Sequence, residues 1–315
     1  MSANLAQTAG VDISKHALDV HLHPQAESAR FSNDAKGFKA MIAWLRRREI
    51  ERIVYEATGA YHRSFEQAMA QAGFILAKVN PARARRFAEA IGQLAKTDAV
   101  DASMLARMGA LLKPRSTVAP SENLDAMQQL LAARRALVKD LVAAQNRLQI
   151  RSLALLRRQL KERLAQIERQ IAAIDRALRE RLKAAPAMKA RFDILTSIPG
   201  VGATSAVTML LEMPELGSLE NKGAASLAGL APIARDSGRW KGERRIRAGR
   251  AHLRRALYMP ALVAARWNRD FKAKYDALVA AGKPKKLALT VLMRKLIVLA
   301  NVLLKENRPW RPKPA

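Results

Sequence analysis

The stretch from Ser121 to Ala185 contains neither glycine nor proline, and this constrains the fold more than any other feature of the chain. Apolar residues recur in its second half every three or four positions, which is the spacing of a coiled-coil seam. One unbroken helix of this length would extend about 100 Å at about 1.5 Å per residue. We therefore expect two antiparallel helices that turn near residues 149 to 155 and serve protein association or spacing. The apolar positions are Leu153, Leu156, Leu160, Leu164, Ile167, Ile171, Ile174, Leu178 and Leu182.

The region before this stretch alternates short apolar runs with helical periodicity. The runs "GVDIS", "LDVHLH" and "SARFS" predict three strands, the first two joined by a tight connection at Ser14 to Ala17. A helix follows, with Asn33 as its expected cap, and then the strand "ERIVYEA", a helix stopped by Gly73, and the strand "FILAKVN". This order begins βββαβα, adds the strand "FILAKVN" and continues with helix through residue 113. It is the element order of a ribonuclease-H-like α/β fold, a mixed sheet flanked by helices.

Glycine and proline return after Pro186, in "SIPGVGATSAVTMLLEMPELGSL", and mark the start of a third, mainly α-helical region. From Arg235 to the end the chain has 22 Lys and Arg against 5 Asp and Glu, so positive charge is concentrated there. The sequence predicts four parts: an α/β domain over residues 7–118, a coiled-coil segment over 119–186, a mainly α domain over 187–306, and a basic tail over 307–315. We expect the tail, "RPWRPKPA", to be disordered.

The overall charge indicates the kind of partner. The chain has 56 Lys and Arg against 27 Asp and Glu, a formal net charge of +29. Because Lys and Arg that neutralise phosphates release counterions, we expect nucleic acid as the partner, with an anionic membrane surface as the second choice. No run of 18 apolar residues and no signal-peptide pattern is present, so we expect a cytosolic protein. Cysteine is absent, which excludes disulfides and thiolate metal sites.

Four acidic residues are candidates for a metal site. Asp98 and Asp101 follow Thr97, a candidate N-cap, and share the first turn of a helix, where the helix dipole stabilises acids without any function. Asp12 and Glu56 favour another interpretation, because each lies at an apolar strand, where a charge is costly. Strand ends are where α/β folds place active sites. Carboxylates from two strands and one helix suit Mg²⁺ or Mn²⁺ and metal-dependent phosphoryl chemistry.

Four segments carry a resemblance to a known family: "GVDISKHALDVHL", "YEATGAYHRSFEQAMAQAGF", "VNPARARRFAEAIGQLAKTDAVDASMLARMGA" and "SIPGVGATSAVTML". In order and spacing they resemble the DEDD transposases of bacterial insertion sequences and the related pilin-gene DNA invertases. The resemblance spans most of the chain and is weakest in the coiled-coil segment. It implies a RuvC-like N-terminal domain whose Asp-Glu-Asp-Asp set falls on Asp12, Glu56, Asp98 and Asp101, and a separate C-terminal transposase domain.

The same resemblance implies partners that composition alone does not reveal. It implies recombination guided by a bridge RNA, encoded by the element, that pairs with both donor and target DNA. It also implies dimers that assemble into tetramers on DNA, with the protein acting at the bacterial nucleoid and not at a membrane. The target sequence, the pairing segments of the RNA, the number of metal ions and the oligomeric state stay open.

Ser237 lies between Asp236 and Gly238 in a strongly basic stretch. From the residues alone a turn is the simpler interpretation, because Asp-Ser-Gly is common turn chemistry and no His/Asp relay is nearby. The resemblance reverses this: in these recombinases a serine of the C-terminal domain attacks DNA to form a phosphoserine link, and Ser237 occupies that position. The resemblance also implies that the acids of one subunit face the serine of another, while the sequence leaves open whether Ser237 acts in cis or in trans. The cations expected to contact nucleic acid are Arg235, Arg239, Lys241, Arg244, Arg245 and Arg247.

The segment "SIPGVGATSAVTML" is typical of a helix-hairpin-helix turn, in which Gly200 and Gly202 would let backbone N–H groups approach phosphate. A tight turn between packed helices is the alternative. Trp240 and Trp267 can stack on bases or pack in the core, and we expect packing.

Two other functions are compatible with the residues. A RuvC-like nuclease would cut DNA with metal-activated water, with Ser237 incidental, and its cleaved ends would carry no protein. A basic architectural protein would use its carboxylates only at helix ends, and would show no Mg²⁺-dependent strand cleavage.

Overall fold

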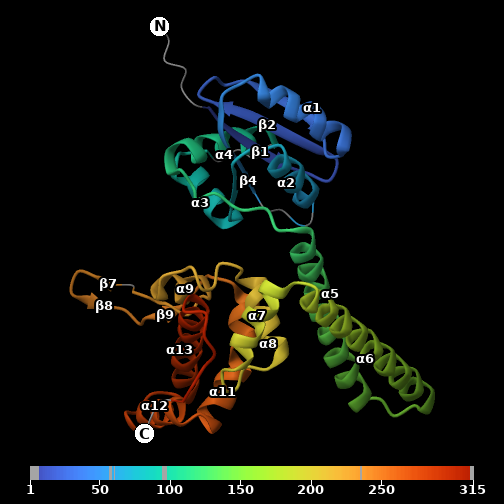
Figure 1. Ribbon diagram of the computed structural model, residues 1–315, viewed down its shortest axis with the longest axis vertical. Coiled ribbons are helices and arrows are strands. Elements are labelled where there is room, and N and C mark those ends of the chain that lie inside the picture. The colour runs from blue at the N-terminus through green and yellow to red at the C-terminus, as the bar shows by residue number, and fades with distance from the viewer. Residues whose placement is uncertain (1–6, 57–58, 60, 94–97, 235, 313–315) are drawn as a thin grey trace. The chain divides into compact units, whose positions relative to one another are not determined.

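The computed structural model describes residues 7–56, 59, 61–93, 98–234 and 236–312, with the side chains of residues 98 and 99 left out. The chain divides into two compact units, Met1–Ser121 and Glu122–Ala315 (Figure 1). Each unit has its own hydrophobic core, so the two are described separately.

The first unit is built on a five-stranded sheet. Its strands are β1 (Gln7–Ile13), β2 (Ala17–His23), β3 (Ser28–Ser32), β4 (Ile50–Glu56) and β5 (Leu76–Val79), in the spatial order β3-β2-β1-β4-β5. The first three strands pair antiparallel, whereas β1 with β4 and β4 with β5 pair parallel. The prediction of a mixed sheet is confirmed.

Helices cover both faces of this sheet. On one face α1 (Ala35–Arg46) and α2 (His62–Gln71) bury Met41 and Phe65 in a core shared with Val11 and Tyr55. On the other face α3 (Pro81–Ala90) and α4 (Asp98–Leu112) pack against Val54 and its neighbours in β5. Because side chains alternate along a strand, the two cores show toward which face of the sheet successive side chains of β1 and β4 point.

The cap of α1 differs from the prediction. Asp34, not Asn33, is the N-cap: its Oδ1 accepts hydrogen bonds from the Gly37 N–H and the Ser32 hydroxyl, both at 2.8 Å. The hydrogen bond from Gly37 and then that from Ser32 hold the pKa of Asp34 below its usual value. Asp and Asn are almost equally good caps, so the sequence could not separate adjacent candidates.

The second unit begins with a helical hairpin. Helices α5 (Glu122–Gln149) and α6 (Ala154–Lys183) are joined by residues 150–153. Hydrogen bonds from Arg181 to Asn123 and from Arg134 to Asp175 run between the arms, which makes the pair antiparallel. The prediction of two antiparallel helices with a turn near residues 149 to 155 is confirmed. That the seam is a coiled coil remains a prediction.

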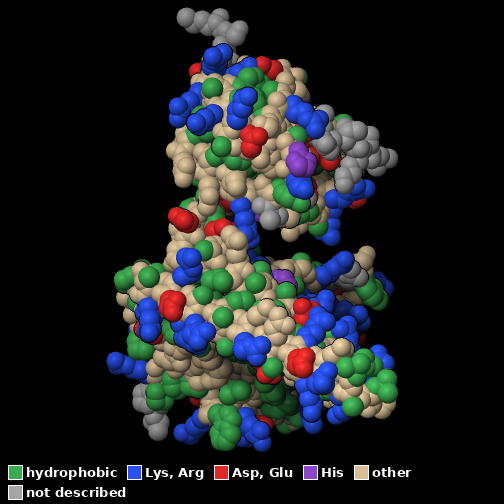
Figure 2. Space-filling view, turned by 90° about the vertical axis from the view of Figure 1, so that its right-hand side faces the viewer, with side chains coloured by type: hydrophobic (Ala, Val, Ile, Leu, Met, Phe, Trp, Pro, Cys, Tyr) green, Lys and Arg blue, Asp and Glu red, His purple; other side chains and the backbone are tan. Residues whose placement is uncertain are grey.

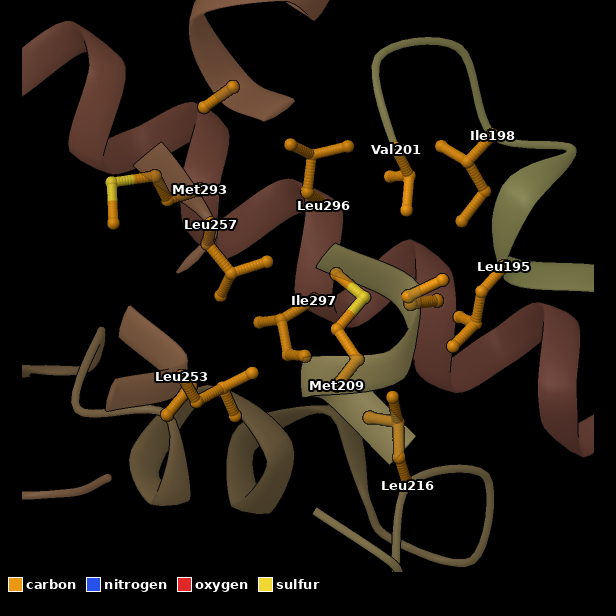
Figure 3. Close-up of a cluster of buried hydrophobic side chains, with 14 of the residues drawn as sticks. Leu195, Ile198, Val201, Met209, Leu216, Leu253, Leu257, Met293, Leu296 and Ile297 are labelled. Carbon is orange, nitrogen blue, oxygen red and sulfur yellow. The ribbon is translucent and has the colours of Figure 1, made fainter. Parts of the chain in front are cut away.

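The rest of the second unit is mainly helical. Its helices are α7 (Pro186–Thr196), α8 (Ala203–Glu212), α9 (Asn221–Leu227), α10 (Ala251–Ala256), α11 (Tyr258–Trp267), α12 (Arg269–Ala280) and α13 (Lys285–Lys305), with short strands β6 (Pro232–Ile233), β7 (Asp236–Ser237), β8 (Trp240–Lys241) and β9 (Arg245–Ile246). Helix α13 contributes Leu296 and Ile297 to the core, where they meet Met209 of α8 and Leu253 of α10 (Figure 3).

Within the described part of the chain, α13 is the one helix long and apolar enough to cross a membrane by length and composition. It packs in the middle of the second core, as Figure 3 shows for Met293, Leu296 and Ile297. We therefore interpret it as a core helix.

The expectation of a disordered tail is wrong for its first residues. Trp310 packs against the second core and its backbone N–H donates to the Ser197 hydroxyl at 2.8 Å. The Arg308 N–H also donates to the Leu303 carbonyl. A single tryptophan in a proline-rich tail was the signal for this docking, because burying an aromatic ring stabilises the fold strongly.

Candidate functional site

Asp12 and Glu56 lie near the carboxyl ends of two neighbouring parallel strands. In the register of β1 and β4, Gly10 pairs with Val54 and Val11 with Tyr55, so Asp12 and Glu56 come next at the same edge. Val11 and Tyr55 point into the core under α1 and α2. Alternation therefore places both half-buried carboxylates on the opposite face, the one covered by α4.

Helix α4 crosses that face in close contact with the strands. A Cβ at Gly10 would meet the Ala102 carbonyl at 2.1 Å, and one at Gly109 would meet the Thr8 and Val54 side chains at 2.5 Å. The end of α4 thus lies over the start of β1, and its first turn runs toward the strand end that carries Asp12. Gly10 in β1 and Gly109 in α4 have no side chains, and this permits the close approach of the helix to the sheet.

The two aspartates of α4 belong to that first turn. Asp101 is half-buried and directly precedes Ala102, which contacts Gly10. Asp98 is the first residue of α4, but its side chain lies outside the described residues, as does the candidate cap Thr97. Sequence and topology thus bring three described carboxylates, those of Asp12, Glu56 and Asp101, to one edge and one face of the sheet.

The chemistry of this donor set fits a hard divalent cation. Carboxylate oxygens are the ligands that Mg²⁺ and Mn²⁺ prefer. Among the described residues, no group of three or more His, Asp or Glu side chains lies close enough together to hold a metal ion. The side chain of the fourth predicted ligand, Asp98, lies outside the described residues.

A buried polar cluster on the opposite face was not predicted from the sequence. Glu66 of α2 is 1% exposed and lies 2.8 Å from the Lys78 ammonium and 3.5 Å from His62 Nε2. The Tyr55 ring stacks edge-on against Phe65 beside it. Burial raises the pKa of Tyr55, and burial followed by the Lys78 charge lowers that of His62. The signal was available: His62 and Glu66 lie four apart in a helix and so share a face.

Ser237 lies on a small exposed hairpin of the second unit. It pairs with Trp240 across a two-residue connection in which Gly238 has a φ of +55°, the arrangement of a type II′ turn. Asp236 and Arg244 approach to 3.8 Å. The turn interpretation is thus correct as local structure. The hairpin β7–β8 projects from the helices of its unit (Figure 1), which leaves the serine hydroxyl accessible.

The predicted cations lie on the same exposed segment. Arg239, Lys241, Arg244, Arg245 and Arg247 are all exposed, whereas Arg235 lies outside the described residues. Figure 2 shows Lys and Arg side chains over much of the visible face of the second unit, with only scattered acids. Such a surface favours a polyanion.

Gly200 and Gly202 lie in the connection between α7 and α8, as predicted, but they differ in surroundings. Gly200 has a φ of +95°, and a Cβ there would meet the Pro260 carbonyl of α11 at 2.8 Å. Gly200 is therefore required by packing. Gly202 is the N-cap of α8 and faces open space, so only its backbone is placed to meet a ligand.

The expectation that both tryptophans pack in the core is wrong. Trp240 is 63% exposed and Trp267 is 76% exposed. The first lies on the β8 hairpin beside Ser237, and the second ends α11 with Arg266 over its ring. An exposed large aromatic ring in a basic region is a feature that stacks on nucleic-acid bases.

Two family models match the chain. One, described as a transposase, matches residues 9–153, and one described as "Transposase IS116/IS110/IS902 family" matches residues 192–276. The first range holds all four candidate acids and the second holds Ser237. Together they match most of the first unit and part of the second.

The chain is also similar to individual proteins. The chain is 27% identical to a pilin gene-inverting protein of Moraxella lacunata over 96% of both chains, and 26% identical to that of Moraxella bovis over the same shares. It is 33% identical, over 36% of its own length and 29% of the relative's, to an uncharacterised 43.6 kDa protein of insertion element IS110 of Streptomyces coelicolor. A solved structure of T. thermophilus RuvC with a Holliday junction aligns with 34% of this chain and 94% of its own, at 11% identity and a TM-score of 0.27.

Proposed function

Because this chain belongs to the IS116/IS110/IS902 family of transposases, we propose that it cuts and rejoins DNA through a metal-bound acidic centre and a covalent phosphoserine intermediate. The observation that supports the proposal is that Asp12 and Glu56 lie at adjacent parallel strand ends, on the face of the sheet that α4 crosses. In this proposal residues 7–118 form a RuvC-like domain, 119–186 a coiled coil, and 187–306 the transposase domain.

The acidic centre would act on the scissile phosphate through a bound metal ion. Asp12, Glu56, Asp98 and Asp101 would hold Mg²⁺ or Mn²⁺, which supplies Lewis-acid polarisation of the scissile phosphate when bound. The half-buried positions of the three described acids limit their movement, so the chain holds its donors at a fixed edge of the sheet. The glycines at positions 10 and 109 keep α4 close enough for its aspartates to share that edge.

Ser237 supplies the nucleophile. Its Oγ forms a bond to phosphorus while one P–O bond of the DNA backbone breaks, the serine proton passes to solvent, and the departing oxygen takes up a proton. Attack of a DNA hydroxyl on the phosphoserine reverses these changes, frees the serine and joins new strands without ATP. Exposed cations such as Arg239 and Lys241 stabilise the negative charge on the non-bridging phosphate oxygens during each attack.

The basic surface and the exposed tryptophan rings would bind the nucleic acids. Donor and target DNA, and the bridge RNA that guides them, would contact the cations through phosphate and stack bases on Trp240 and Trp267. The backbone at Gly202 offers a further phosphate contact. The chain acts as dimers that assemble into tetramers on DNA, with the acids of one subunit serving Ser237 of another.

The serine is tested by Ser237→Ala. The variant should form no covalent protein–DNA adduct, because it lacks the attacking hydroxyl, whereas the wild type should show one on a denaturing gel. Ser226→Ala, which changes an exposed serine of the same unit, is the matched control and should form adducts normally. An adduct that survives Ser237→Ala would place the nucleophile elsewhere.

The acidic centre is tested by Asp98→Asn and Asp101→Asn, made separately. Each should stop recombination, because a neutral amide holds a divalent ion far less well, and each should leave RNA binding largely intact. Glu89→Gln, an exposed acid of the same unit, is the control. Normal recombination by both aspartate variants would refute the metal site.

A second candidate function is a nuclease that cuts with metal-activated water. It is favoured by the type II′ turn, because that turn accounts for Asp236, Ser237 and Gly238 without any catalytic role. The two functions differ in one product: nuclease ends carry no protein, whereas recombinase ends carry a phosphoserine link.

A further inference from the structure

Asn33, which does not cap α1, makes hydrogen bonds to two distant backbone segments. Its Nδ2 donates to the Ser14 carbonyl at 2.8 Å and to the Tyr61 carbonyl at 3.1 Å. Ser14 lies two residues after Asp12, and Tyr61 lies five residues after Glu56. One side chain thus joins the backbone that follows each of the two strand ends.

The chemistry of these contacts requires an amide nitrogen. Both partners are carbonyl oxygens, which only accept hydrogen bonds, so the atom between them must donate twice. The NH₂ group of Asn does this, and the carboxylate of Asp, which has the same shape, cannot. The Oδ1 of Asn33 is buried and, within the described chain, has no hydrogen-bond partner, so the nitrogen provides the contacts that hold this side chain.

Both carbonyls belong to backbone that is fixed by other contacts. The Ser14 N–H donates to the Ala17 carbonyl at 2.9 Å, and the Ser14 hydroxyl donates to the same oxygen, which closes the β1–β2 connection. Tyr61 is the N-cap of α2, and α2 is anchored to β5 by the buried Glu66–Lys78 pair. A bond between two fixed segments holds them at a set separation.

We propose that Asn33 is a positioning residue for the acidic centre, tying the end of β1 that carries Asp12 to the segment that follows Glu56. This inference rests on the proposed function, because it assigns Asn33 a role toward carboxylates proposed to bind a metal ion. Asn33 itself touches neither the ion nor the DNA. Its loss leaves every ligand present but frees the backbone at Tyr61 from the β1–β2 connection at Ser14.

The test measures Mn²⁺ binding to the full chain without nucleic acid, by electron paramagnetic resonance. Asn33→Asp and Asn33→Ala should each weaken Mn²⁺ binding about tenfold, the lower part of the range for residues that orient metal ligands. Asp34→Ala is the matched control: it removes the neighbouring N-cap of α1 and lowers thermal stability, but leaves the tie intact and should leave Mn²⁺ affinity unchanged. All variants are compared below their unfolding temperatures, checked by circular dichroism.

The outcomes separate this inference from the proposed function. Unchanged Mn²⁺ affinity in both Asn33 variants, with binding lost in Asp12→Asn, overturns the role of Asn33 alone. Equal loss of affinity in Asp34→Ala also overturns it, because general loosening of α1 then explains the effect. Failure of the wild type to bind Mn²⁺, or equal binding by Asp12→Asn, overturns the acidic metal centre and this inference with it.

Discussion

At the scale of single residues, Glu66 is the one fully buried charged side chain in the described part of the molecule, at 1% exposure. A buried carboxylate is tolerated only when a partner offsets its lost hydration. Lys78, 2.8 Å away, is that partner, and His62 adds a weaker contact. Because burial and the Lys78 charge lower the pKa of His62, Lys78 carries most of the compensation.

Removing Lys78 should therefore destabilise the first unit strongly. We expect Lys78→Ala to lower the free energy of unfolding by about 3 kcal/mol, because the carboxylate of Glu66 stays buried without its main partner. Urea unfolding followed by circular dichroism measures this change. Lys39→Ala removes an exposed lysine of α1 and should cost less than about 0.5 kcal/mol. Equal effects of the two substitutions would contradict the conclusion that Lys78 is the main partner of Glu66.

The sequence revealed some of these residues and concealed others. Asp12 and Glu56 could be recognised because a charge in an apolar strand is unusual, and the structure places both at one sheet edge. Asn33 could not be interpreted correctly, because its two partners lie 19 and 28 residues away and no local pattern encodes them. That Asp12, Glu56, Asp98 and Asp101 together bind a metal ion stays a prediction.

At the scale of elements, the packing of α4 on the sheet depends on two glycines, Gly10 and Gly109. Helices normally pack on a sheet through side chains, but here the helix backbone meets Gly10 directly. The order and type of elements in the first unit followed from periodicity, because each strand and helix carries its own pattern. This close approach was not predictable, because Gly10 meets the backbone of α4, and Gly109 meets Thr8 and Val54, only after folding.

Gly10→Ala should displace α4 and weaken the first unit. The new methyl group would lie 2.1 Å from the Ala102 carbonyl, a backbone atom that moves only with its helix. We expect a loss of about 3 kcal/mol in the free energy of unfolding, the upper part of the usual range for overpacking. Gly223→Ala in α9, where a methyl group meets nothing within 4 Å, is the control and should be neutral or slightly stabilising. Equal stability of the two variants would show that α4 adjusts freely.

At the scale of the whole molecule, the net charge of +29 sets how the chain meets nucleic acid. Each cation that neutralises a phosphate makes affinity more dependent on salt. The exposed hairpin cations are proposed to be among those contacts, but exposure alone does not separate them from the other surface cations of the second unit.

The salt dependence of DNA binding distinguishes the cations near Ser237 from the other surface cations of the second unit. Replacing Arg239 and Lys241 together by Ala should reduce the slope of log affinity against log salt by about 2, because about one unit is lost per phosphate contact. Fluorescence anisotropy over a salt series measures the slope. A double Ala variant at Arg158 and Lys161, which are exposed on α6, removes the same charge and should change the slope less. An equal reduction in both variants would mean that binding follows net charge and not the hairpin.

The antiparallel course of α5 and α6 has a consequence for how such chains vary in length. Asn123 and Arg181, at the two ends of this excursion, lie within one hydrogen bond of each other. The polypeptide therefore enters the α5–α6 hairpin and leaves it at the same place. Matched insertions or deletions in the two arms change how far the tip reaches while both points of attachment stay fixed, so the span of the hairpin can evolve without rebuilding the rest of the molecule.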